Sequence, residues 1–115
     1  MKKREIRDYL NDLITACEDI LTFTKGMCFE DFIADRKTNN AVVRCLEVIG
    51  EATKNLPETL KVQYPDIPWK QMAGMRDKLI HEYFGVDIEI LWKVAKDEIP
   101  PLKSLIQNIL NSLGG

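Results

Sequence analysis

The chain has 115 residues and a mass of 13.2 kDa, which corresponds to one domain without room for a second catalytic domain. Hydrophobic residues make up 45% of the sequence and charged residues 30%, values of an ordinary globular domain that exclude intrinsic disorder. The formal net charge is −2, whereas a protein that coats nucleic acid is basic, because neutralising phosphates supplies most of its affinity. A nucleic-acid role must therefore depend on a local basic patch or on a site that does chemistry.

The sequence has no feature of a membrane or exported protein. No apolar run comes close to the roughly 18 residues that a membrane-spanning helix requires. The start of the chain is basic, but Glu5, Arg7 and Asp8 occupy the place of the apolar segment of a signal peptide. We therefore expect a cytoplasmic protein.

The three cysteines, Cys17, Cys28 and Cys45, include no CxxC pair, and the chain has a single histidine. Free thiols are therefore expected, and neither a structural zinc site nor a cofactor is predicted. Cys17 and Cys45 fall on apolar helical stripes, where a thiol packs as a small hydrophobic group.

Apolar residues recur at intervals of three and four over residues 4–25, which predicts an amphipathic helix that Gly26 ends. A short turn of helix is expected over residues 29–33. Asp35 then caps a second long helix, because its side chain can accept the backbone N–H groups of the first turn. This helix stops at Pro57.

Proline and glycine divide the second half of the chain. Residues 57–64 form a short helical segment, and Pro68 begins the next helix at a position where its missing N–H costs nothing. Gly85 is placed to end that helix. Asp87 is placed to cap a last helix that runs to about residue 113.

Pro100 and Pro101 fall inside this last helix. Each removes a backbone donor and clashes with the preceding turn, so the two prolines are expected to kink the helix or to split it. No segment has the alternating pattern of a β-strand, and no internal repeat is visible. The fold expected for residues 1–115 is a single all-α domain, an antiparallel bundle of four or five helices.

The helix expected over residues 68–85 carries the residues that could take part in catalysis or ligand binding. At 100° per residue its apolar side chains form one arc. Arg76 falls near the middle of that arc, where an always-charged guanidinium is expensive to desolvate unless a partner or a ligand meets it. A structural pair with a buried carboxylate or carbonyl fits this position about as well as a functional role. The arc consists of Trp69, Met72, Ala73, Met75, Leu79, Ile80, Tyr83 and Phe84.

His81 is the only histidine and lies on the border of the arc. Asp77, four residues earlier, can reach the imidazole, fix its tautomer and support its protonated form. Gly74, one heptad earlier, leaves the same strip of the helix bare, so that a substrate backbone could approach closely. A surface histidine without a function is the alternative, since Arg76 and His81 are about 140° apart on an ideal helix.

The stretch Arg76-Asp77-Lys78-Leu79-Ile80-His81-Glu82-Tyr83 resembles the Arg-x4-His-x-Tyr motif of HepT-like toxins, which are members of the HEPN superfamily. The resemblance covers most of the chain. An Arg-x4-His pair alone is common by chance, but together with five further segments the match is specific. These segments are Ile49-Gly50-Glu51-Ala52, Ile67-Pro68-Trp69, Gly74-Met75, Val86-Asp87 and Leu91-Trp92.

The resemblance implies a HEPN-like fold and a metal-independent ribonuclease that acts as the toxin of a type VII-like toxin–antitoxin pair. Arg76 and His81 match the family's catalytic pair, with Asp77 in support. Tyr83 matches the tyrosine that a small MntA-like nucleotidyltransferase antitoxin modifies with AMP. The implied partners are RNA and the antitoxin, and neither DNA nor a membrane is among them.

Cleaving RNA without a metal requires a base for the 2′-hydroxyl, an acid for the leaving 5′-oxygen and a cation near the phosphorane. His81 can act as base or acid at neutral pH, and Arg76 can hold the non-bridging oxygens. One chain offers one histidine. A two-fold homodimer that joins two Arg76/His81 pairs in one cleft would supply the second proton-transfer group.

Two other functions remain open. The chain could be a non-catalytic helical subunit that presents substrate to a nucleotidyltransferase, or a helical interaction module in which Arg76 and His81 form structural pairs. The family motif favours the ribonuclease over the interaction module. It separates the ribonuclease less well from the non-catalytic subunit, because both require a nucleotidyltransferase nearby. The basic residues Lys2, Lys3, Arg4 and Arg7 could contact RNA phosphates, and Arg44 or Glu51 could assist the site. A solvated position is expected for all six.

Overall fold

The computed structural model describes residues 4–81 and 88–113, with the side chains of all of these except residues 76–81. Within these residues every regular element is helical, which confirms the all-α prediction. The elements are α1 (Ile6–Thr24), α2 (Phe29–Ala34), α3 (Arg36–Lys54), α4 (Glu58–Gln63), α5 (Trp69–His81), α6 (Ile88–Lys93), a π-helical segment (Val94–Glu98) and α7 (Ile99–Ser112).

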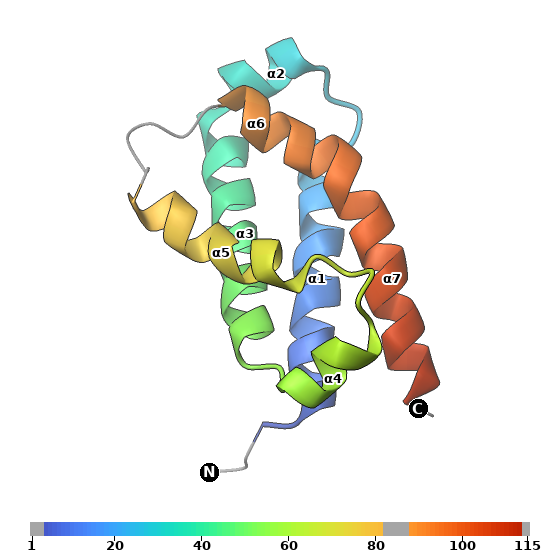
Figure 1. Cartoon of the computed structure of the whole chain (residues 1–115). Coiled ribbons are helices and arrows are strands. Elements are labelled where there is room, and N and C mark those ends of the chain that lie inside the picture. Colours follow the sequence, from blue (N-terminus) through green and yellow to red (C-terminus); the bar gives the residue numbers. More distant parts are fainter. Residues whose placement is uncertain (1–3, 82–87, 114–115) are drawn as a thin grey trace.

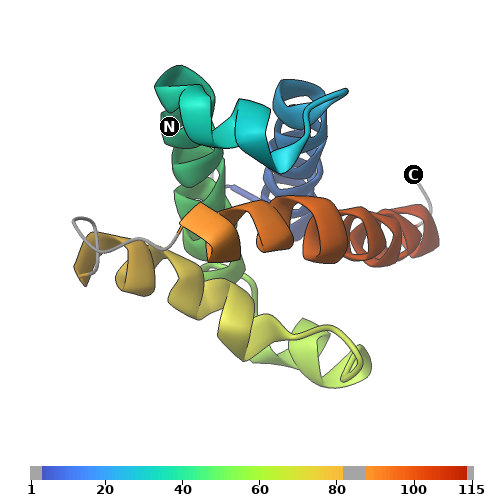
Figure 2. The ribbon, with the colours of Figure 1, turned by 90° about the horizontal axis from the view of Figure 1, so that it is seen from above.

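The helices α1, α3 and α7 form the body of the molecule. α1 and α3 lie side by side and antiparallel, and α7 packs along α1 (Figure 1). α5 also packs on α3, but it crosses that helix instead of running along it (Figure 2). The arrangement is the antiparallel helical bundle expected from the sequence, with α5 inclined across it.

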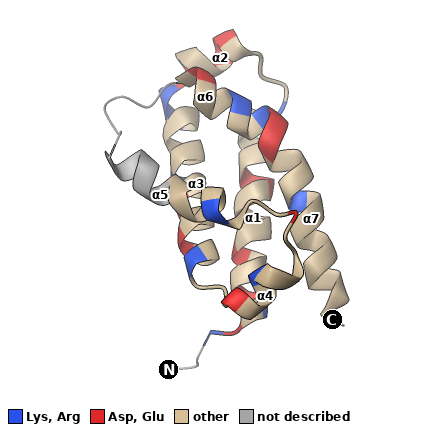
Figure 3. Ribbon diagram, in the orientation of Figure 1, with Lys and Arg blue, Asp and Glu red and all other residues tan. Residues whose placement is uncertain are grey.

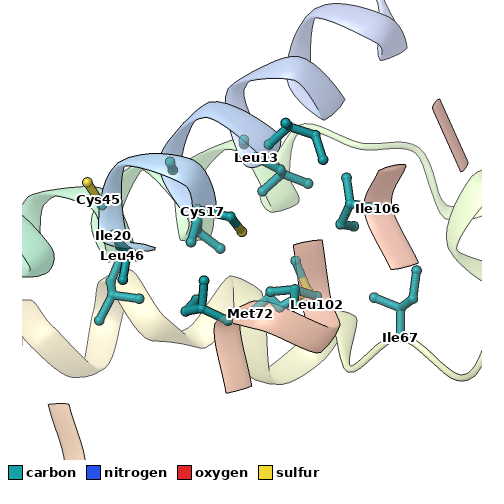
Figure 4. Close-up of a cluster of buried hydrophobic side chains, with 14 of the residues drawn as sticks. Leu13, Cys17, Ile20, Cys45, Leu46, Ile67, Met72, Leu102 and Ile106 are labelled. Carbon is teal, nitrogen blue, oxygen red and sulfur yellow. The ribbon is translucent and has the colours of Figure 1, made fainter. Parts of the chain in front are cut away.

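One apolar core lies between these helices. Figure 4 shows Cys17, Leu46, Met72 and Leu102 directed into it from α1, α3, α5 and α7. Burying a Leu, Ile, Phe or Met side chain stabilises the folded state by about 1.5–3 kcal/mol, so this core is the main favourable term in folding. Its largest fully buried side chains include Leu10, Leu13, Ile20, Phe32, Ile49, Met72, Ile99, Ile106 and Ile109.

The three cysteines are free thiols, as predicted. Cys17 and Cys45 are buried in the core, whereas Cys28 is exposed. Burial raises the pKa of the Cys17 thiol to about 12 and that of the Cys45 thiol to about 11, because a thiolate is poorly solvated in an apolar interior. Both thiols therefore stay protonated in the folded protein at neutral pH.

Two helix ends follow the residues that the sequence predicts for them. α1 ends at Thr24, and Gly26 beyond it has a φ of 76°, a left-handed conformation that residues with a Cβ rarely adopt. Asp35 caps α3: its Oδ1 accepts the backbone N–H of Thr38 at 3.0 Å, and its Oδ2 accepts the Thr38 hydroxyl at 2.8 Å. The carboxylate thus fixes the turn from α2 into α3.

The start of α5 is close to its predicted position. α5 begins at Trp69, one residue after Pro68, whose carbonyl accepts the backbone N–H of Met72 at 3.0 Å. Gly85 and Asp87, which the sequence places at the end of this helix and at the cap of the last one, lie outside the described residues.

The last helix bends near Pro100 and Pro101 (Figure 1), as predicted, while its helical backbone continues without a gap from residue 88 to residue 112. α6 is followed directly by the π-helical segment and then by α7, which has the prolines in its first turn. The N–H of Ile99 donates to the carbonyl of Val94, five residues earlier. The wide turn suits the prolines, since neither has an N–H to donate and each ring would crowd the carbonyl of the preceding turn. The ribbon changes direction between α6 and α7 (Figure 1).

A lysine on the π-helical segment joins three helices. The Nζ of Lys96 donates to the carbonyl of Thr24, the last residue of α1, at 3.1 Å. The same ammonium lies 5.0 Å from the ring centroid of Trp92 on α6. The Trp92 ring packs against Phe32 of α2, with 5.1 Å between the ring centroids. The ends of α1, α2 and α6 therefore meet around one cation.

Candidate functional site

The motif residues lie on the C-terminal half of α5. Arg76, Asp77 and His81 are within the helix, while their side chains, and Tyr83 as a whole, lie outside the described part of the structure. On an α-helix, Arg76 and His81 are separated by about 7.5 Å along the axis and about 140° around it. The helix therefore brings the two residues within one and a half turns of each other without putting them on the same face.

The first turns of α5 anchor this helix to the core. Trp69 is 8% exposed and Met72 is 0% exposed. The indole N–H of Trp69 donates to the carbonyl of Tyr64 at 2.9 Å, and the Tyr64 hydroxyl lies 3.1 Å from the Ser112 hydroxyl at the end of α7. The motif residues thus extend from an end of α5 that is held in place by the core and by α7.

Gly74 gives α5 the bare strip that the sequence predicts. A Cβ built at this position meets no atom of the described residues within 4 Å. Met75, the next residue, is partly buried and packs against the apolar core. As far as its side chains are described, α5 therefore buries its apolar arc and leaves the strip at Gly74 open.

The helix α3 supplies the surface against which α5 packs. Cys45 on α3 is buried, and the pKa of its thiol is raised mainly by this burial and further by the carboxylate of Asp19 on α1. Asn39, six residues earlier, is turned about 120° away from Cys45 on an ideal helix. It is in line with the buried Leu46 and Gly50. Asn39 is therefore in line with a side of α3 that the bundle buries.

Asn39 has a feature that the sequence does not reveal. Its Oδ1 is fully buried, yet it has no hydrogen-bond donor among the residues that the structure describes. In the sequence Asn39 stands in an ordinary polar run at the start of a predicted helix, so neither its burial nor its lack of a partner could be inferred from the pattern. Both depend on how α3 packs in the bundle.

Three arginines outside the motif interact with groups of the chain itself. Arg4 lies 2.9 Å from the carboxylate of Asp12, and Arg7 donates to a backbone carbonyl just after α7 at 3.3 Å. Arg44 is mostly exposed and lies 3.3 Å from the carboxylate of Glu47. Basic and acidic positions are interspersed on the described helices (Figure 3). These contacts favour the solvated, structural interpretation of the three arginines.

The described side chains contain no group of three His, Cys, Asp or Glu residues that could hold a metal ion. None of the helices in residues 4–81 and 88–113 is both long and apolar enough to cross a membrane.

The helical bundle and the motif on α5 are the features that the resemblance to HEPN-type ribonucleases implies. The family model described as "Ribonuclease HepT-like" matches residues 13–109, which is most of the chain. The chain therefore belongs to the HepT-like family of ribonucleases, and it is an enzyme that cleaves RNA, as predicted.

Individual relatives are similar over nearly their whole length. The chain is 54% identical to "Probable ribonuclease HepT" of Thermococcus cleftensis over 93% of this chain and 97% of that protein. It is 50% identical to "Putative RNase MJ1216" of Methanocaldococcus jannaschii, over 100% of this chain and 95% of that protein. It is also 50% identical to "Putative RNase MJ0125" of the same organism, over 98% of this chain and 97% of that protein. No solved structure matches the chain.

Proposed function

We propose that the chain is the toxin of a type VII-like toxin–antitoxin pair, an endoribonuclease that cleaves RNA without a metal ion and uses Arg76 and His81 as its catalytic residues. The observation that carries this proposal is the Arg-x4-His-x-Tyr motif, whose Arg76 and His81 lie on α5, in a chain that belongs to the ribonuclease HepT-like family. The active unit is a single domain of residues 1–115 that acts in the cytoplasm on RNA, and not on DNA or a membrane.

In this reaction the ribose 2′-hydroxyl attacks the adjacent phosphorus, and the bond from phosphorus to the 5′-oxygen breaks. A base takes the hydroxyl proton and an acid protonates the 5′-oxygen, which leaves a 2′,3′-cyclic phosphate and a 5′-hydroxyl end. His81 moves one of these protons, and Asp77, one turn earlier, fixes its tautomer. Arg76 holds the non-bridging oxygens, whose negative charge grows in the phosphorane.

The active form is a homodimer. The reaction requires two proton-transfer groups, and each chain has one histidine. A two-fold axis beside α5 would join two motif helices in one cleft and so supply the second group. In such a cleft the open strip at Gly74 would leave the motif helix approachable by an RNA backbone.

An MntA-like nucleotidyltransferase antitoxin silences the enzyme by transferring AMP from ATP to the hydroxyl of Tyr83, with pyrophosphate as the leaving group. The antitoxin, and not this chain, binds the ATP and the magnesium ion. Tyr83 is two residues from His81 in the sequence. Each AMP adds a phosphodiester anion and a base near Arg76, so it competes with RNA phosphate for the guanidinium and fills the cleft.

The proposal is tested by digesting total RNA with the purified protein and sequencing the new ends, with and without EDTA. We expect new 5′-hydroxyl ends at defined positions and the same rate in EDTA, because the proposed catalytic groups are side chains. Expressing the chain without its neighbouring nucleotidyltransferase is expected to arrest growth. A protein that neither cleaves RNA nor arrests growth would instead be the non-catalytic subunit that presents substrate to the nucleotidyltransferase.

A further inference from the structure

Gly74 lies inside α5 without a packing reason in the described structure. A glycine in the interior of a helix is less stable than an alanine by about 1 kcal/mol. A Cβ built at Gly74 meets no atom of the described residues within 4 Å, so the fold leaves space for a larger side chain. The bare position is therefore better explained by contact with a molecule outside the chain.

Lys70 lies about one turn before Gly74 and is exposed. Among the described residues no carboxylate pairs with its ammonium, whereas Arg4 and Arg44 each have one. The first turn of α5 contains no acidic residue, although negative and not positive charge stabilises a helix at this end. Neither an ion pair nor the stability of the helix thus explains a cation at this position.

Lys70 and Gly74 lie on the side of α5 that is turned away from the core. Each is two residues from Met72, which is 0% exposed, and is therefore turned about 160° from it on an ideal helix. His81, the last residue of α5, is within about 20° of both in direction and about 17 Å beyond Lys70 along the axis. The three positions form one line along the helix. Asp77, the acidic residue on this line, is assigned to His81 in the proposed mechanism.

We infer that Lys70 binds a phosphate of the RNA a few nucleotides from the bond that is cleaved, while the RNA backbone follows the bare surface at Gly74. Because about 17 Å of helix separates Lys70 from His81, this phosphate is not the scissile one. An ammonium on a flexible stem binds a phosphate without reading a base, so the contact sets affinity and register. The inference rests on the proposed function, since it takes the motif on α5 as the catalytic site.

The binding test uses an RNA oligonucleotide that contains the cleavage site and carries 2′-O-methyl groups, which remove the attacking hydroxyl and prevent cleavage. Lys70→Met keeps much of the aliphatic stem and removes the charge, so the Kd is expected to rise severalfold. The slope of log Kd against log salt concentration is expected to fall by about 0.7, the value for one phosphate contact on a single strand. Lys25→Met, at an exposed position just after α1, is the matched control and is expected to keep the wild-type slope.

A scan with uncharged methylphosphonates, one in each oligonucleotide, locates the phosphate. Wild-type binding is expected to weaken when the neutral linkage is a few nucleotides from the cleavage site, and Lys70→Met is expected to show no further loss there. Gly74→Leu is expected to weaken binding at least as much as Lys70→Met does. Its Tm is expected to stay the same or rise, because leucine is a better helix former than glycine.

An unchanged salt slope in Lys70→Met overturns the inference, and so does a scan in which Lys70→Met responds at every linkage as the wild type does. Loss of the homodimer in Gly74→Leu also overturns it, because the bare surface would then face a second copy of the chain. Binding to the 2′-O-methyl RNA is measured without catalysis. Cleavage by His81→Ala at the wild-type rate would therefore refute the catalytic assignment separately, so the two failures are distinguishable.

Discussion

Among single residues, His81 has the most direct test. Replacing His81 with Ala removes the proposed proton-transfer group, so RNA cleavage is expected to fall by at least about 100-fold and toxicity is expected to disappear. The helix content measured by circular dichroism is expected to stay the same, because a residue at the border of the apolar arc contributes little to the core. Gln71→Ala, at an exposed position earlier on α5, is the control. Wild-type cleavage by His81→Ala would remove the catalytic assignment.

The two buried thiols predict how stability depends on alkaline pH. Burial raises the pKa of Cys17 from 9.0 to about 12 and that of Cys45 from 9.0 to about 11. Above about pH 9 the unfolded chain loses protons that the folded protein keeps. The contribution of the thiols to the free energy of unfolding is therefore complete below about pH 9 and is lost as the pH rises toward 11–12.

Urea denaturation at a series of alkaline pH values measures this effect. The wild-type free energy of unfolding is expected to decrease more steeply with pH than that of a Cys17→Ala/Cys45→Ala protein, which has no buried thiol to keep protonated. Ser104→Ala, at an exposed position on α7 without a titrating group, is the control and is expected to retain the wild-type slope. Equal slopes in all three proteins would contradict the assignment of the effect to the buried thiols.

For single residues, the sequence predicts those structural roles that follow from a local pattern. The burial of Cys17 and Cys45 follows from their place on apolar stripes, and the cap at Asp35 follows from its position just before a helix. The unpaired oxygen of Asn39 could not be predicted, because it depends on the packing of neighbouring helices and not on the residues next to it in the chain.

At the scale of helices, Lys96 is predicted to stabilise the junction of α1, α2 and α6. Replacing Lys96 with Met keeps much of the aliphatic stem and removes the ammonium that bonds the Thr24 carbonyl and faces Trp92. The free energy of unfolding in urea is expected to fall by about 1–2 kcal/mol. Lys93→Met, at an exposed position in the same helical run, is the control and is expected to change stability little. Equal effects of the two substitutions would show that the Lys96 contacts are not stabilising.

Most helices were predictable because their apolar spacing and their capping residues agree. The sequence places α1 and α3 within a few residues of their observed ends. It also predicts an interruption at Pro100 and Pro101. It does not predict the π-helical turn that precedes them, because that turn depends on how the whole segment accommodates two residues without an N–H. The inclination of α5 across α3 was not predictable either, because a periodic pattern shows which face of a helix is buried and not the angle at which it packs.

At the scale of the whole molecule, the need for two proton-transfer groups predicts a homodimer. Sedimentation at micromolar concentration is expected to give twice the mass of one chain, with an interface that buries on the order of 800 Å² per partner. A mixture of His81→Ala and wild-type chains is expected to lose activity in proportion to mixed dimers if both histidines serve one cleft. A monomer that cleaves RNA at the full rate would exclude the shared cleft.

Co-expression with the neighbouring nucleotidyltransferase tests the proposed control of the enzyme. The intact mass of the chain is expected to increase by one or more AMP units attached to Tyr83, and RNA cleavage by the modified protein is expected to disappear. Tyr83→Phe lacks the acceptor hydroxyl, so it is expected to keep its original mass and remain toxic in the presence of the partner. Inhibition of Tyr83→Phe by the partner would mean that silencing does not require this modification.

The π-helical segment has a consequence for how genes of this family can change in length. Its hydrogen bond spans five residues where a regular helix spans four, so the chain contains one residue more than a regular helix over the same path. Deleting that residue alone would force Pro100 and Pro101 into a regular helix, where their rings clash with the preceding turn. The extra residue of the π-helical segment and the two prolines are therefore expected to be gained or lost together. A homologous gene without the prolines is expected to be one codon shorter at this place.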